Sequence, residues 1–147
     1  NLKKGELMDV NRALDECMKV IRNAAKKGYT MSIGGDASEP GYYGFEAAAI
    51  VPSFDIPRDH IDQDSREFRI YNRTTGDDHG VHLLAWKRVG GRDWYLIKDS
   101  ARSSRHGAFE GYYFYRDDYI RLKMLTIMVH RDAIAHLAGK LEAEEGG

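Results

Sequence analysis

Apolar side chains near both ends of the chain recur at spacings of three and four residues, which is the period of an amphipathic helix. Near the start, this apolar face consists of Val10, Leu14, Cys17, Ile21 and Ala24. We expect a helix from about Asp9, a candidate N-cap, to Lys27, with Gly28 just beyond its end. Near the other end, the pattern predicts a final helix over residues 132–144 with the apolar face Ala133, Ile134, Leu137 and Leu141.

Between these helices the pattern changes to the alternation and the short apolar runs that are typical of β-strands. Strands are predicted over residues 29–33, 80–89, 94–98, 111–115 and 124–130. Gly90, Gly91 and Arg92 form a predicted hairpin turn. A short helix is expected over residues 63–71, and a turn or short helix over 116–119. This order of elements predicts an α+β fold in which a twisted antiparallel sheet packs against flanking helices.

A sharp turn is predicted at Gly34, Gly35 and Asp36, and a long loop follows over residues 37–62. The glycine pair lacks the spacing of a Walker or dinucleotide-binding loop, so we interpret it as a turn that lines a cleft. Irregular stretches of this length are uncommon in a compact domain and are more often functional than accidental.

Composition limits the partners of the chain. Its 147 residues fit one domain and are enough for a hydrophobic core without a disulfide or a metal. The net charge of -1 argues against general nucleic-acid binding. With 31% charged residues and short apolar runs, we expect no membrane-spanning helix. The chain begins with Asn1 rather than Met, which suggests a fragment or a processed product, and the first residues do not read as a signal peptide.

His79 is the first candidate for chemistry, because it stands where a polar turn meets a strand, and an imidazole there can serve as a general base. A surface histidine that caps the turn explains the position equally well. Asp77, Asp78, His79 and His82 also suggest a metal site. Side chains alternate along a strand, however, so His79 and His82 point to opposite faces. We therefore expect no metal site and interpret His82 as a core or supporting residue.

Asp99 is the second candidate. It ends the return strand of the predicted hairpin, so it can approach His79 at the start of the partner strand and orient the imidazole. The alternative is a carboxylate that binds nearby backbone amides. Cys17 is the only cysteine and lies in the middle of a helix on its apolar face, where a thiol usually acts as a small hydrophobic side chain.

In their order and spacing, these segments resemble the C-terminal half of a papain-like cysteine peptidase, of the bleomycin hydrolase and aminopeptidase C subgroup. Two segments resemble the family's His-Ala/Gly-Val and Lys-Asn-Ser-Trp-Gly motifs, namely Asp78-His79-Gly80-Val81 and Lys98-Asp99-Ser100-Ala101-Arg102. Residues 28–39 are similar to the strand and turn beside the subgroup's cleft, and 74–79 to its Thr-Thr-Asp-Asp-His motif with one glycine inserted. The segments 107–115 and 124–134 are similar to the strand and the closing elements that follow.

The resemblance implies that residues 1–147 form the β-rich right half of the papain fold, with His79 as general acid and base and Asp99 at the position of the orienting asparagine. In this family the nucleophilic cysteine lies in the N-terminal half, which is absent from this sequence. The implied activity is peptide hydrolysis of an aminopeptidase type without a cofactor, and this chain alone is expected to be inactive. The implied partners are a peptide, the cysteine-bearing half and other copies in a homo-oligomer. The compartment stays open between cytoplasmic and periplasmic or secreted.

Two departures from the family pattern carry consequences. The carboxylate of Asp99 replaces a carboxamide and favours an imidazolium at His79. Ala101 replaces the tryptophan that shields this pair from water, so we expect a more solvated and weaker pair. The departures favour one alternative to a peptidase, a papain-like binding module without catalytic activity. A third function, a metal hydrolase, would be built on Asp77, Asp78 and His79.

Overall fold

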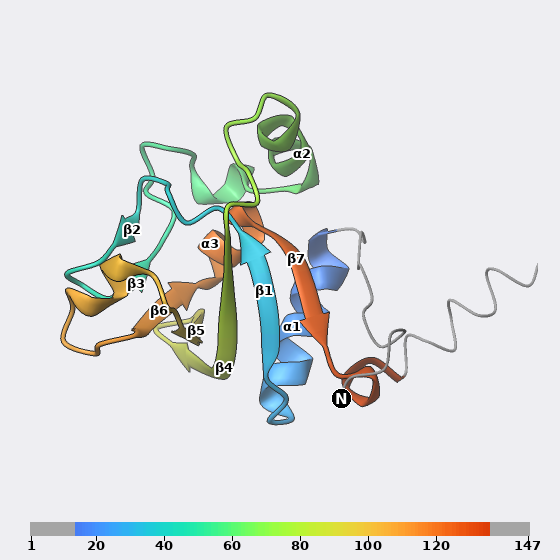
Figure 1. The fold of residues 1–147 in the computed structure, drawn as a ribbon. Coiled ribbons are helices and arrows are strands. Elements are labelled where there is room, and N and C mark those ends of the chain that lie inside the picture. Colours follow the sequence, from blue (N-terminus) through green and yellow to red (C-terminus); the bar gives the residue numbers. More distant parts are fainter. Residues whose placement is uncertain (1–13, 136–147) are drawn as a thin grey trace, which may run out of the picture.

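The computed structural model describes residues 14–135, which form one seven-stranded sheet with three α-helices (Figure 1). The α-helices are α1 (Leu14–Lys26), α2 (Gln63–Tyr71) and α3 (Asp117–Lys123). The strands are β1 (Met31–Gly35), β2 (Tyr42–Tyr43), β3 (Ala48–Ala49), β4 (His79–Val89), β5 (Arg92–Lys98), β6 (Tyr112–Arg116) and β7 (Met124–Val129). Three 3-10 helices are η1 (Arg58–His60), η2 (Arg102–Arg105) and η3 (Arg131–Ile134). The predicted α+β class is confirmed.

The strands lie in the order β2-β3-β6-β5-β4-β1-β7. All neighbouring pairs are antiparallel except β3 and β6, so the expectation of an entirely antiparallel sheet was wrong at one pair. The hairpin between β4 and β5 turns at Gly90 and Gly91, whose φ angles of 56° and 75° are the left-handed values that such a turn requires. Arg92, which was predicted in the turn, is the first residue of β5.

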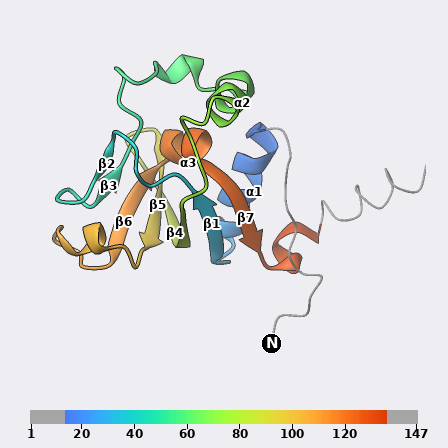
Figure 2. The same cartoon turned by 45° about the horizontal axis from the view of Figure 1, so that its top comes forward.

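One face of the sheet forms the core. It packs against α1, which lies behind the strands in Figure 1, and against α3. Alternate residues of the strands are buried here, among them Leu83, Tyr95 and Ile97, and they meet Ile21 of α1. The turned view places α2 and α3 together above one end of the sheet (Figure 2). Over residues 14–135, no helix has the length and apolar content that crossing a membrane requires.

Several sequence predictions change at the ends of elements. The first helix ends at Lys26, one residue before the predicted Lys27, and Gly28 follows it at φ 83°, whereas the predicted start at Asp9 lies outside the described residues. The predicted final helix begins as the 3-10 helix η3, and its remainder also lies outside them. The long loop 37–62 holds η1 and the strands β2 and β3, which are too short for any apolar pattern to reveal.

The prediction of a turn at Gly34 and Gly35 was wrong, because both residues belong to β1, a strand paired on both sides. Glycine is required there by close packing. A Cβ on Gly35 would overlap the backbone of Lys123 and lie 2.7 Å from the Cα of Met124. A Cβ on Gly34 would lie 2.6 Å from Oγ1 of Thr126. The two glycines therefore let β1 approach β7 closely.

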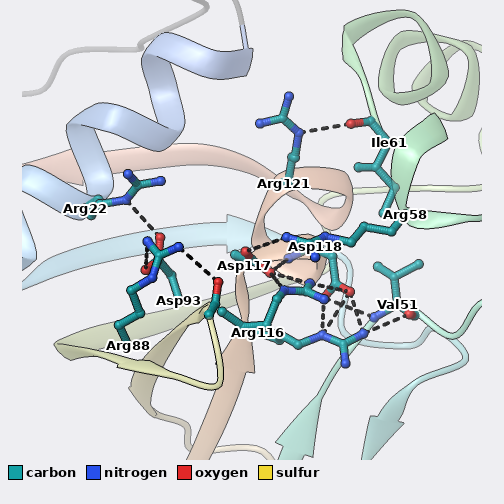
Figure 3. A network of polar contacts seen from close by, with 12 residues as sticks. Arg22, Val51, Arg58, Ile61, Arg88, Asp93, Arg116, Asp117, Asp118 and Arg121 are labelled. Atoms are coloured by element: carbon teal, nitrogen blue, oxygen red, sulfur yellow. Dashed lines mark hydrogen bonds and ion pairs between the residues drawn. The ribbon is translucent and has the colours of Figure 1, made fainter.

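Arginines and aspartates connect the start of α3 to distant parts of the chain (Figure 3). The Nε of Arg116 donates to the buried Asp118 at 2.9 Å, and its guanidinium also donates to the carbonyl oxygen of Val51 at 3.2 Å. The Nε of Arg121 donates to the carbonyl oxygen of Ile61 at 3.0 Å. Arg92 of β5 lies 3.1 Å from Asp118. These contacts fix the second half of the long loop against α3 and β5.

Candidate active site

His79 and Asp99 meet at one end of the central hairpin. His79 is the first residue of β4 and Asp99 follows the last residue of β5, so antiparallel pairing brings them side by side. The Nε2 atom of His79 lies 2.6 Å from Oδ1 of Asp99. The side chain of His79 is 25% exposed, whereas that of Asp99 is fully buried. The approach expected from the hairpin is therefore present.

Asp99 accepts further hydrogen bonds on both carboxylate oxygens. The backbone N–H of Ala101 donates to Oδ1 at 2.8 Å, and the hydroxyl of Tyr42 donates to Oδ2. Both interpretations of Asp99 therefore hold at once, since it binds the imidazole and a nearby amide. Burial by itself raises the pKa of Asp99, but the hydrogen bonds from Tyr42, Ala101 and His79 outweigh it and hold this pKa below its ordinary value. Asp99 is a carboxylate at neutral pH, and Nε2 of His79 is its donor.

The other ring nitrogen of His79 stays available. Among residues 14–135, none makes a hydrogen bond to Nδ1, and the ring is partly exposed. An imidazole held in this way can take a proton from a group that approaches Nδ1 and return it. This is the arrangement that nucleophilic catalysis by a paired cysteine requires.

Cys17 does not fill that role. It lies on α1 and packs against the hydrophobic core. Burial raises the pKa of its thiol, and the nearby charge of Arg66 offsets this only in part. A protonated thiol in the core is a poor nucleophile, in agreement with the structural role expected for it.

The residues before His79 are held by the end of β1. Gly35 pairs with His79 across the sheet, and its carbonyl oxygen accepts from the N–H of Asp78 at 3.1 Å. The carboxylate of Asp78 accepts from the N–H of Ala37 at 3.0 Å. Asp36 is buried and accepts from the N–H of Gly76 at 2.9 Å. The carboxylate of Asp36 thus supports the turn that carries His79, and the expectation that Gly34, Gly35 and Asp36 line a cleft stays a prediction.

The opposite face of the sheet bears an open hollow of about 850 Å³ that is not lined by His79. It is lined by residues of β1, β4 and β7, including Ser32, His82 and Met128, and reaches Asp99 at its end. His82 is exposed, so the interpretation as a core residue was wrong. Strand alternation turns it away from His79, as predicted, and the face to which it points is open.

The geometry gives no support to the metal-hydrolase alternative. Within the described part of the chain, no three His, Cys, Asp or Glu side chains gather closely enough to hold a metal ion. Asp78 is already bound to the backbone of Ala37, and His79 is bound to Asp99.

Sequence reasoning missed Tyr42. The tyrosine sits in the segment that was predicted as loop, 57 positions from Asp99, with no pattern around it that marks a site. The sequence offered no signal for this contact, because the His79–Asp99 pair was expected to be solvated.

Comparison with solved structures supplies the remaining evidence. PepW of Lactobacillus rhamnosis HN001 (DR20) has a similar structure. The TM-score is 0.60 at 16% sequence identity, over 90% of this chain and 30% of the PepW chain. The chain therefore shares a fold with part of PepW and spans about a third of that protein's length. No family model and no curated protein sequence matches the chain.

Proposed function

We propose that this chain is the histidine-bearing part of a papain-like cysteine peptidase of the bleomycin hydrolase type, with aminopeptidase activity. The observation that carries the proposal is the state of His79: Nε2 is held by the buried Asp99, while Nδ1 is unbonded among the described residues and partly open. The fold shared with PepW supports the same assignment.

In the proposed reaction, a cysteine thiolate outside this sequence pairs with the imidazolium of His79 through Nδ1. The thiolate attacks the peptide carbonyl carbon, and His79 gives its proton to the leaving amine as the C–N bond breaks. His79 then takes a proton from water, whose oxygen attacks the thioester carbonyl carbon; the C–S bond breaks, the acid leaves, and the thiolate is again paired with the imidazolium of His79. Asp99 keeps the ring in place and stabilises the imidazolium.

The proposal defines the partners. The nucleophile must come from a cysteine-bearing half supplied by another chain or by a longer form of the same protein, and the substrate is a peptide with a free amino end. A homo-oligomer is also proposed from the family resemblance. The chemistry uses thiol, imidazole and water, so no cofactor is required.

The test begins with native mass spectrometry of the protein purified from its source, before and after denaturation. We expect a second cysteine-bearing polypeptide, or one longer chain, together with hydrolysis of aminoacyl amides that a thiol-alkylating reagent abolishes. In that protein His79→Ala is expected to lower kcat by about 10²–10⁴-fold, the usual contribution of a general acid–base residue. His82→Ala is the matched control, because His82 lies three residues along the same strand on the opposite face. Undiminished hydrolysis by a folded His79→Ala protein would refute the assigned role.

A second candidate function is a papain-like binding module without catalysis. It is favoured by one observation: the described residues bring no cysteine to Nδ1 of His79. Purification of this chain with no cysteine-bearing partner and no alkylation-sensitive hydrolysis would decide for it.

A further inference from the structure

The burial of Asp99 contradicts an expectation from the sequence. With Ala101 at the position of a shielding tryptophan, the His79–Asp99 pair was expected to be solvated. The side chain of Asp99 is nevertheless fully buried. Another group must therefore exclude water from this carboxylate, and the structure shows Tyr42 bonded to it.

Tyr42 is held rigidly by an aromatic cluster. Its ring stacks on Tyr113, with centroids 4.4 Å apart and planes at 26°. Tyr115 meets it edge-on at 6.0 Å, and Tyr119 lies at 6.1 Å. The strand that carries Tyr42 pairs with β3, which in turn pairs with β6. A ring fixed on several sides can hold its hydroxyl in one place at little further entropic cost.

We propose that Tyr42 is a positioning residue for the His79–Asp99 pair: its hydroxyl holds Oδ2 of Asp99 so that Oδ1 faces Nε2 of His79, and its ring keeps water from the carboxylate. The effect on catalysis rests on the function proposed above, whereas the effect on Asp99 does not. The hydroxyl takes the place of the missing tryptophan by a different contact, a hydrogen bond to the carboxylate itself.

The identity of residue 99 fits this arrangement. An ionised carboxylate accepts on both oxygens, whereas a carboxamide presents N–H donors on one side. Here Oδ1 receives His79 and the Ala101 amide, and Oδ2 receives Tyr42, so every neighbour is a donor. Burial, together with the nearby Tyr115 and Asp99, raises the pKa of Tyr42, so its hydroxyl keeps the proton that it donates.

Other titratable groups also surround this site. The phenols of Tyr115 and Tyr119 face it from β6 and α3, and burial raises their pKa values, so both stay neutral. Besides Asp99, three carboxylates act on these rings: Asp36 and Glu39 raise the pKa of Tyr119, and Asp78 raises the pKa of both tyrosines. Asp78 precedes β4 and is bonded to the N–H of Ala37. A change in the titration of Asp99 after substitution of Tyr42 therefore reports the hydrogen bond between them.

The experiment is NMR of the 147-residue chain and its Tyr42→Phe variant, which removes only the hydroxyl. The carboxyl carbon of Asp99 reports its titration, and the pKa of Asp99 is expected to rise, because the hydrogen bond from Tyr42 lowers it. The Nε2 proton of His79 is expected to move downfield, because a carboxylate with fewer donors accepts more strongly. Tyr43→Phe is the matched control: Tyr43 is the next residue in β2 and is 43% exposed, so both signals are expected to stay unchanged.

A second probe keeps both the ring and the hydroxyl of residue 42. A single 3-fluorotyrosine at position 42 keeps the hydroxyl but makes it more acidic, so it donates more strongly and shifts both signals in the opposite direction. A folded Tyr42→Phe chain with wild-type signals overturns the proposal, as does a fluorinated chain that shifts in the same direction as Tyr42→Phe. If Tyr42→Phe does not fold, the sign of the shift in the fluorinated chain decides alone. Neither readout requires hydrolysis, so failure of the proposed peptidase activity remains distinguishable.

Discussion

Asp99 receives donors from three separate parts of the chain: the imidazole of His79, the backbone of Ala101 and the hydroxyl of Tyr42. Burial of a charged group costs free energy, and these hydrogen bonds offset that cost. Because the pKa of Asp99 lies below its ordinary value in the folded chain, the carboxylate contributes to stability as well as to the proposed chemistry.

This contribution has a defined pH dependence. A lowered pKa in the folded state stabilises the protein above the pKa of the unfolded state, about 3.9, and this stabilisation is lost as the pH falls through the folded value. From about pH 4 downward, we therefore expect the free energy of unfolding to fall less steeply in Asp99→Asn than in wild type, as measured by urea denaturation at a series of pH values. Asp59→Asn, at an exposed carboxylate, is the control. Parallel pH profiles for wild type and Asp99→Asn would contradict this.

At the scale of elements, β1 determines where His79 lies. Gly35 pairs with His79, and the pairing of β1 with β7 shifts register between Gly34 and Gly35. The backbone of Lys123 and Met124 lies against the Cα of Gly35, so no side chain fits at this position. A strand interior is an unfavourable place for glycine unless another backbone must come close, and this is such a case.

Gly35→Ala is therefore expected to lower the free energy of unfolding by about 1–3 kcal/mol, the usual cost of overpacking, because backbone atoms must move. The matched control is Gly80→Ala, one position beyond His79 on β4, where nothing lies within 4 Å of the added Cβ. We expect this control to change stability by no more than about 0.5–1 kcal/mol in either direction. Urea denaturation of the three proteins measures both values, and equal stability of the two variants would show that β1 can adjust.

At the scale of the whole molecule, a buried cluster of charges joins the long loop to two helices. The side chain of Lys123, in α3, is fully buried, and its Nζ lies 2.8 Å from Glu39 and 3.5 Å from Asp55. Asp55 also pairs with Arg69 of α2 at 2.8 Å, and Glu39 accepts from the hydroxyl of Thr75 at 3.3 Å. The loop that carries Tyr42 is therefore held on both sides of the tyrosine, at Glu39 and at Asp55.

Removal of the lysine from this cluster is expected to be costly, since it leaves the carboxylate of Glu39 without a cation and that of Asp55 with Arg69 alone. Lys123→Met should lower the free energy of unfolding by about 3–5 kcal/mol, whereas Lys98→Met, at an exposed lysine, should change it by less than about 0.5 kcal/mol. Addition of Glu39→Gln to Lys123→Met should recover part of the loss, because it neutralises one of the two carboxylates. Thermal and urea denaturation check these values, and wild-type stability of Lys123→Met would show that the cluster contributes nothing net.

The sequence by itself determined the α+β class, the course of the central hairpin, the α2 helix and the position of His79 at the start of a strand. These features follow from local periodicity, from turn chemistry at Gly90 and Gly91 and from the antiparallel geometry that any hairpin imposes. The sequence also placed His79 and Asp99 at one end of that hairpin, but it left open whether the carboxylate binds the imidazole or nearby amides, and the structure shows both contacts.

Only the tertiary structure decided the burial of Asp99, the contact with Tyr42 and the strand position of Gly34 and Gly35. Each depends on residues that lie far apart in the chain: Tyr42 is 57 positions from Asp99, and the backbone against Gly35 belongs to Lys123. A glycine pair carries the same local signal whether it forms a turn or admits a neighbouring backbone. A tyrosine in a loop carries no sign of the carboxylate that it will meet. Such contacts arise from packing between elements, which local patterns along the chain do not encode.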